Sequence, residues 1–272
     1  MVARVNGSFA TSAVSGTRFS DLRWIAETGS TNRDLLEAAT RGVPEGMVLV
    51  ADHQTAGRGR LDRSWVAPAG ASLLVSVLLR PSLDTEQLFL LTLACALAAI
   101  EAVEEVSGVK LGLKWPNDLV VAEGPLVDRK LAGILAESQV SAGRVDAVVV
   151  GMGLNLNWPA DLPADLAATA TSVNHLTNGP VNREQLCVAW LRRYDALLDN
   201  LTDPQGRDRF LGVVRAASTT IGRRVRVERA TESFEGDAVD ISSLGHLLVD
   251  RGDGSEIEEI TVGDVIHARP IG

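Results

Sequence analysis

The chain has 272 residues, of which 46% are hydrophobic and 22% are charged, and its formal net charge is −9. This composition is typical of a folded globular protein, and the length allows one domain of ordinary size plus a small one. The acidic balance argues against broad adhesion to nucleic acid, because that adhesion depends on neutralising phosphates.

Two further observations concern the compartment. The longest apolar run, residues 88–100, is shorter than the roughly 20 residues that span a bilayer, so we expect no membrane segment. Cys95 and Cys187 lie in apolar helical contexts without metal-ligand spacing, which predicts buried free thiols. We therefore expect a cytoplasmic protein.

The first third of the chain predicts strands that alternate with helices. The first twenty residues contain no acidic residue, a faint transit-peptide composition, but they lack an apolar signal region and a cleavage site. We therefore expect a frayed or loosely docked terminus there. Ser30 or Thr31 is well placed to cap a helix that begins there. The expected strands are 22–26, 47–51 and 71–79, and a second helix is expected over 85–106.

The middle of the chain predicts neighbouring strands, then a loop-rich stretch over 158–179 and two helices, 182–201 and 204–217. The strands are 109–114, 119–121, 130–136 and 144–150. Because these successive strands resemble hairpin partners, we expect a mixed or antiparallel sheet and not a doubly wound parallel one.

From Ile221 onward the pattern changes to short strands separated by Gly- and Asp-containing turns. The expected strands are 223–228, 233–240, 247–249 and 257–262, which suggests a small appended β-barrel. We therefore predict an α+β protein with one domain over 1–218 and a second over 219–272.

An arginine-glycine stretch follows the strand at 47–51. Arg58, Arg60 and Arg63 lie within six positions, with Gly57 before the first and Gly59 between the first two. Glycine allows close approach to a ligand, and arginine offers forked donors that fit carboxylate and phosphate. The stretch could form an anion pocket, a solvated surface turn or a nucleic-acid contact, and its own residues leave all three open.

Several motifs of common enzymes are missing from the sequence. It contains no phosphate-binding P-loop, no dinucleotide fingerprint, no HExxH and no Gly-x-Ser-x-Gly. Hydride transfer, zinc hydrolysis and serine hydrolysis are therefore disfavoured.

Basic and acidic groups at strand ends remain as candidates. Lys114 precedes Trp-Pro-Asn-Asp, where Asp118 could bind Mg²⁺ with Asn117 beside it, or could be a solvated residue of a β-turn. Lys130 begins an apolar strand and needs an anionic partner there, and Gly133 permits close approach of a ligand.

Two polar turns also follow predicted strands. Ser30, Thr31 and Asn32 form either a simple helix cap or a grip for a polar ligand. Asn155 follows the 144–150 strand through two glycines, where it could contact an adenine or a sugar, or could belong to a β-bulge.

Five motifs in this order closely resemble the biotin–protein ligases, also called biotin–[acetyl-CoA-carboxylase] ligases. They are Ser-Thr-Asn at 30–32, Gln54 with Gly-Arg-Gly-Arg at 57–60 and Arg63 and Trp65, Lys-Trp-Pro-Asn-Asp at 114–118, Lys-Leu-Ala-Gly-Ile-Leu at 130–135, and Gly-Met-Gly-Leu-Asn at 151–155. The resemblance covers roughly residues 28–157, and the β-rich C-terminus fits the family's SH3-like domain.

The resemblance implies a catalytic domain related to class II aminoacyl-tRNA synthetases and a reaction in two steps. Biotin and ATP, with Mg²⁺, give biotinyl-5′-AMP and pyrophosphate. The biotinyl group then passes to a lysine of a biotin carboxyl carrier domain of acetyl-CoA carboxylase or another biotin-dependent carboxylase.

Site residues follow from the resemblance by position. The implied biotin-binding residues are Ser30, Thr31, Asn32, Gln54, Gly57, Arg58, Gly59, Arg60, Trp65, Lys130, Gly133 and Leu135. The implied ATP-binding residues are Arg60, Arg63, Lys114, Asn117, Asp118 and Asn155. Lys130, Arg58 and Lys114 would be catalytic, and Asp118 would be the Mg²⁺ ligand.

The chain departs from many bacterial relatives at its N-terminus. Only about twenty residues precede the first predicted strand, too few for a helix-turn-helix. We therefore expect a short form that lacks the N-terminal DNA-binding domain, does not bind DNA, and is a monomer or weak homodimer.

Two alternatives to biotin ligation stay open. A lipoate or octanoate ligase of related fold should offer a longer apolar channel, whereas Gln54 and the Ser-Thr-Asn turn suit the polar ureido ring. A non-enzymatic nucleic-acid-binding module should carry surplus basic residues and stacking aromatics, and the chain has neither.

Overall fold

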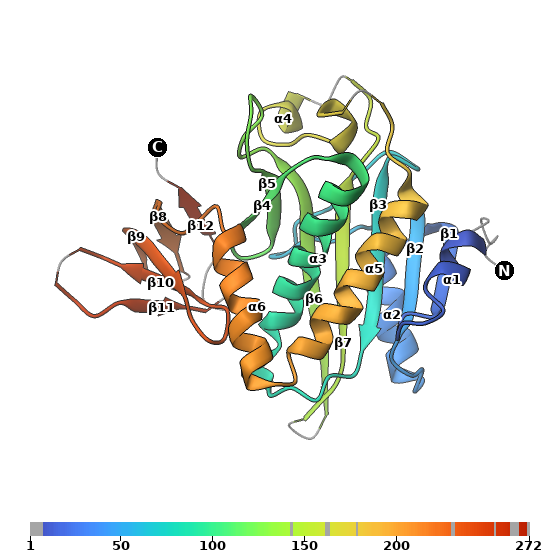
Figure 1. Cartoon of the computed structure of the whole chain (residues 1–272), viewed down its shortest axis with the longest axis horizontal. Coiled ribbons are helices and arrows are strands. Elements are labelled where there is room, and N and C mark those ends of the chain that lie inside the picture. The colour runs from blue at the N-terminus through green and yellow to red at the C-terminus, as the bar shows by residue number, and fades with distance from the viewer. Residues whose placement is uncertain are drawn as a thin grey trace.

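A seven-stranded sheet forms the centre of the larger part of the protein (Figure 1). The computed structural model describes residues 8–141, 144–160, 164–177, 179–229, 232–252, 254–261 and 267–270. In spatial order the strands are β1 (Asp21–Thr28), β2 (Met47–Gln54), β3 (Ser72–Leu79), β7 (Arg144–Asn155), β6 (Lys130–Ser141), β5 (Asp118–Val121) and β4 (Leu111–Lys114). Only β1 and β2 pair in parallel, so the predicted mixed, largely antiparallel sheet is confirmed.

Helices cover both faces of this sheet (Figure 1). One face is covered by α3 (Phe89–Ser107), α5 (Arg183–Asn200) and α6 (Pro204–Ala217), and the other by α2 (Thr31–Thr40). The alternation along the strands explains the two layers. In β3, Val75 and Val77 face the α3 core, whereas Leu78 faces the α2 core. The α2 face is where the candidate site lies.

The N-terminal segment is docked, so the expectation of a loose terminus is wrong for residues 8–19. Helix α1 (Ser8–Ala13) begins the described chain, and Ala10, Val14 and Phe19 are buried. Arg192 on α5 donates to the Ala13 carbonyl at 2.7 Å. Small apolar residues dock here because α5 supplies a matching apolar surface, which the local composition does not reveal.

Strand β7 extends beyond the predicted end at residue 150, through both glycines to Asn155. Gly151 and Gly153 are therefore strand residues and not part of a turn. A Cβ at Gly151 would lie 2.8 Å from Cγ of Asn32, and one at Gly153 would lie 2.6 Å from Nε1 of Trp65. These glycines make room for side chains that approach the sheet closely.

Shorter elements refine the remaining predictions. The helix expected from residue 85 is a 3₁₀ turn, η1 (Thr85–Gln87), followed by α3. The loop-rich stretch 158–179 contains α4 (Ala164–Ala167) and η2 (Val173–His175). No helix within the described residues is long and apolar enough to cross a bilayer.

The C-terminal part is a five-stranded antiparallel sheet beside α6 (Figure 1). Its spatial order is β11 (Glu258–Ile260), β10 (Leu247–Asp250), β9 (Ser233–Ile241), β8 (Arg224–Glu228) and β12 (His267–Pro270). The first four were predicted from the sequence and β12 was not. The indole N–H of Trp115 donates to the carbonyl of Gly245 at 3.1 Å, which joins this sheet to the strand-β4 turn. The domain boundary after residue 218 stays a prediction.

Both cysteines are buried free thiols, as predicted. Burial raises the pKa of the Cys187 thiol to about 12 and that of Cys95 still further. Because the thiolate is the reactive form and the raised pKa suppresses it, we predict negligible labelling of the folded protein by a disulfide reagent at pH 8. Both thiols should react after denaturation. Rapid labelling of the folded protein, followed by absorbance, would contradict this.

Candidate active site

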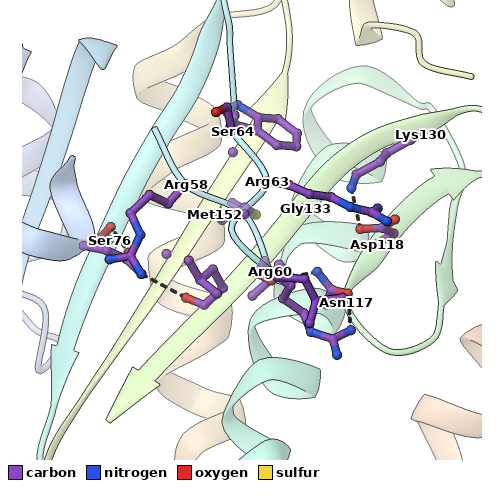
Figure 2. Close-up of a pocket in the computed structure, with 18 of the residues that line it drawn as sticks. Arg58, Arg60, Arg63, Ser64, Ser76, Asn117, Asp118, Lys130, Gly133 and Met152 are labelled. Carbon is purple, nitrogen blue, oxygen red and sulfur yellow. Dashed lines mark hydrogen bonds and ion pairs between the residues drawn. The ribbon is translucent and has the colours of Figure 1, made fainter. Parts of the chain in front are cut away.

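A cavity of about 460 Å³ lies between the α2 face of the sheet and the loop over residues 58–65 (Figure 2). This volume is in the range typical of small-molecule sites. Of the residues implied by the resemblance, those that line the cavity are Ser30, Thr31, Asn32, Gln54, Arg58, Gly59, Arg60, Arg63, Trp65, Lys114, Asn117, Asp118, Lys130, Gly133 and Leu135. Segments far apart in the sequence therefore meet in one place.

Two of the predicted residues do not line the cavity. Gly57 lies at the base of the loop, and its carbonyl accepts from the Trp65 N–H at 2.9 Å. The Asn155 amide donates to the Thr171 carbonyl at 3.1 Å, and its Oδ1 is buried without a hydrogen-bond partner in the structure. Asn155 therefore lies outside the cavity lining, beside the segment that contains Thr171.

A buried polar wall occupies the α2 end of the cavity. Ser30 occupies the N-cap position of α2 but makes no side-chain capping bond. The Gln54 Oε1 takes that place and accepts from the Thr31 backbone N–H at 2.7 Å. The hydroxyls of Thr31 and Ser76 are 2.7 Å apart. The polar turn is thus held by neighbouring strands, and its contacts extend beyond a simple helix cap.

Asn32 continues this wall across the sheet. Its Oδ1 accepts from the Ser76 hydroxyl at 2.6 Å, and its amide donates to the carbonyl of Leu135 at 3.2 Å and to Oε2 of Glu137 at 2.9 Å. Ser76 and Glu137 were not predicted from the sequence. The signal available was weak: Ser76 is a single serine within the apolar run 73–79 of β3, and Glu137 is one of several polar residues in β6.

The arginine loop is closed on itself by backbone hydrogen bonds. Gly59 N–H donates to the carbonyl of Arg63 at 2.6 Å, and Arg58 forms a β-bridge with Ser64. Leu61 and Asp62 at its tip both have φ of 56°, a conformation that favours glycine. The loop directs its arginines toward the sheet (Figure 2).

Positive charge is concentrated around the cavity. The described lining residues include five cationic side chains, Arg58, Arg60, Arg63, Lys114 and Lys130, and one carboxylate, Asp118. Burial lowers the pKa of the Arg60 guanidinium, and the charge of Arg63 acts in the same direction against the opposing effect of Asp118. Crowded cations that lose water are stabilised by an anionic ligand, so the geometry favours an anion pocket over a solvated surface turn.

Lys130 has the anionic partner that its position at the start of an apolar strand requires. Its Nζ lies 2.6 Å from Oδ1 of Asp118, and the neighbouring Asn117 accepts from Arg60 at 3.3 Å (Figure 2). Asp118 is therefore already engaged by a lysine. Within the described residues, no group of three or more His, Cys, Asp or Glu side chains could hold a metal ion.

The floor of the cavity is a flat glycine surface under an indole ring. Gly133 on β6 pairs with Gly153 on β7, and the Trp65 ring lies over both. The Lys130 ammonium is 5.5 Å from the centre of this ring. The Trp65 indole N–H is buried without a partner in the structure. Any side chain at either glycine would displace the ring.

Comparison with known proteins agrees with this arrangement. Residues 24–155 match the model of the Biotin/lipoate A/B protein ligase family, and residues 220–268 match that of the Biotin protein ligase C terminal domain. A biotin–[acetyl-CoA-carboxylase] ligase from Mycobacterium tuberculosis is 36% identical over 260 residues, which cover 93% of this chain and 91% of the relative. The structure of a biotin protein ligase from Aquifex aeolicus in complex with biotin and ATP is similar with a TM-score of 0.77, at 29% identity over 93% of this chain and 100% of that one.

The fold, the cavity and the match at 24–155 define a ligase of the biotin and lipoate class. Within that class, the identity and coverage show that the chain belongs to the biotin–protein ligase family.

A further relative carries a second activity in its name. The bifunctional ligase/repressor BirA from Bacillus subtilis is 32% identical over 241 residues, which cover 87% of this chain and 70% of the relative. The expectation that this chain does not bind DNA stays a prediction.

Proposed function

We propose that this protein activates biotin with ATP and transfers the biotinyl group to a lysine of a biotin carboxyl carrier domain. The observation that carries the proposal is the meeting, in one cavity, of a buried polar wall and a cluster of cationic side chains. Biotin is complementary to both features, because it has a polar ureido ring at one end and a carboxylate at the other.

In the first step, a biotin carboxylate oxygen attacks the α-phosphorus of ATP and pyrophosphate leaves. Ser30, Thr31, Asn32 and Gln54 would bind the ureido and thiophene end, because they form the polar wall. Lys130 would bind the carboxylate and the α-phosphate and bring these two anions together. Positioned cations of this kind act by orientation and by stabilising charge that develops in the transition state.

Arg58 and Arg60 in the loop, with Arg63 beyond them, would cover biotin and the phosphates. Lys114 and Asn117 lie at the β4–β5 turn on the far side of the cavity and would serve the nucleotide. Enclosure by this loop would keep water from the mixed anhydride until the acceptor arrives.

Asp118 fits Mg²⁺ as a single protein ligand. Mg²⁺ at nucleotide sites is commonly held by one or two carboxylates and by the substrate phosphates, which is consistent with the lone carboxylate among the described lining residues. The bound ion would neutralise phosphate charge. Lys130 already pairs with Asp118, so the carboxylate would be shared between the lysine and the ion.

In the second step, the amine of the acceptor lysine attacks the acyl carbon of biotinyl-5′-AMP and AMP leaves. The acceptor would be a carrier domain of acetyl-CoA carboxylase or of another biotin-dependent carboxylase. We further propose that the ligase acts as a monomer or weak homodimer in the cytoplasm.

The polar wall also supports biotin over a lipoyl or octanoyl chain. Thr31, Asn32 and Ser76 are buried and hydrogen-bonded where an acyl chain would need apolar contacts. A wall of polar groups can offer further hydrogen bonds to a ureido ring and none to an acyl chain, so it favours biotin.

We predict that biotin, and neither lipoate nor octanoate, stimulates exchange of labelled pyrophosphate into ATP. Exchange requires reversible adenylate formation, so it reports the first step without an acceptor. Removal of Mg²⁺ by a chelator should abolish the exchange. Exchange with octanoate alone would favour the alternative ligase, and its absence with all three acids would contradict the proposed function.

A further inference from the structure

Glu137 on β6 contacts two parts of the site at once. One carboxylate oxygen lies 3.0 Å from the Arg58 guanidinium, and the other accepts from the Asn32 amide at 2.9 Å. Arg58 belongs to the loop that covers the cavity, and Asn32 belongs to the polar wall. The Glu137 side chain is only 19% exposed, so this carboxylate acts in a partly dehydrated environment.

At the Asn32 end, the contact fixes the orientation of the side-chain amide. A carboxylate only accepts hydrogen bonds, so it selects the NH₂ end of the amide. The Leu135 carbonyl also takes this NH₂ group, while the Ser76 hydroxyl donates to the opposite Oδ1. Asn32 therefore presents one orientation, and through Ser76 it is linked to the Thr31 hydroxyl in the same wall.

At the Arg58 end, the contact ties the loop to the sheet. The loop's backbone hydrogen bonds described above, from Gly59 to Arg63 and from Trp65 to Gly57, close the loop on itself. The Arg58–Glu137 pair instead joins it to β6. The Glu137 side chain is 19% exposed and that of Arg58 is 39% exposed, so the carboxylate is the more shielded partner of the pair.

We propose that Glu137 is a positioning residue, which holds the arginine loop over the cavity before the substrates bind and orients Asn32 toward biotin. Its effect on biotin rests on the proposed function, whereas its effect on the loop does not. Glu137 acts through Arg58 and Asn32, and neither of the two steps requires it to exchange a proton.

The first test is the biotin dependence of pyrophosphate exchange by Glu137→Gln. The neutral amide loses the ion pair, and its NH₂ group must face one of two donors, Arg58 or Asn32. We expect the KM for biotin to rise by about tenfold, the size of one lost charged hydrogen bond, with a much smaller change in kcat. The matched control is Glu123→Gln, which removes an exposed ion pair with Lys110 outside the site and should leave both parameters unchanged.

The second test is limited trypsin digestion without ligand, with mass spectrometry of the cut sites. In Glu137→Gln, cleavage after Arg60 and Arg63 should accelerate relative to the unsubstituted protein and to Glu123→Gln. In an Arg58→Ala background, the same substitution should add nothing, because the partner is already gone. This comparison does not depend on enzymatic activity, because it is made without substrates.

The outcomes separate the two proposals. If the unsubstituted protein shows no biotin-dependent exchange, the proposed function fails while the digestion still tests the loop. Unchanged loop cleavage together with an unchanged KM for biotin would overturn the role of Glu137. Faster cleavage throughout the chain, with a lowered Tm, would overturn it as well, because it would show a general structural role.

Discussion

Replacing Lys130 with alanine should reduce adenylate formation by about a hundredfold or more, the usual effect of removing one transition-state donor. The Lys130 Nζ is the cation that would bring the biotin carboxylate and the α-phosphate together. The fold should survive, because the Asp118 carboxylate left behind is 27% exposed and stays partly hydrated. Pyrophosphate exchange and thermal unfolding measure the two quantities separately.

The matched control for this substitution is Lys110→Ala. Lys110 precedes β4 and pairs with Glu123 at 3.3 Å, but its side chain is 56% exposed and does not line the cavity. Exchange by this variant should match that of the unsubstituted protein. Near-normal exchange by Lys130→Ala would show that its assigned role is wrong.

Replacing Gly153 with alanine should also disable the site, although glycine has no functional group. The new Cβ would lie 2.6 Å from Nε1 of Trp65, so the ring and the attached loop would have to move. A misplacement of about 1 Å can cost on the order of a hundredfold in rate. We expect kcat/KM for biotin to fall by about that factor in the exchange assay.

Gly212→Ala is the matched control for this effect. Gly212 lies within α6, and an added Cβ there meets no atom within 4 Å. Alanine should raise the free energy of unfolding by about 0.5–1 kcal/mol, because it restricts the unfolded chain and favours helix, with no change in activity. Normal activity of Gly153→Ala would contradict the claim that the site needs a glycine beneath the Trp65 ring.

Much of the fold could be predicted because the strands are apolar or alternating runs bounded by turns and the helices carry local signals. The helix expected at 204–217 has these bounds in the structure, with the Asp203 side chain accepting from the Gly206 N–H. The errors arose where tertiary contacts decide whether a segment is ordered and where a strand ends. Helix α1 is held by α5, and β7 continues through two glycines because it pairs with β3 and β6 there. Such contacts leave no local pattern.

The site could be predicted as far as motifs carry it. Fifteen of the seventeen implied residues line one cavity. The structure therefore agrees with their expected positions, and their roles stay predictions. Asn155 does not line the cavity, and its amide donates to the Thr171 carbonyl. Ser76 and Glu137 were missed, because their importance comes from cross-strand contacts to Asn32 that neither residue's own neighbourhood indicates.

The most direct test of the central claim is transfer to an acceptor. The purified protein would be incubated with biotin, Mg²⁺-ATP and a biotin carboxyl carrier domain, and the acceptor analysed by mass spectrometry. We predict one added biotinyl group on one lysine, dependent on both biotin and ATP and lost with Lys130→Ala. An acceptor of unchanged mass, with the unsubstituted protein folded and both substrates present, would contradict it.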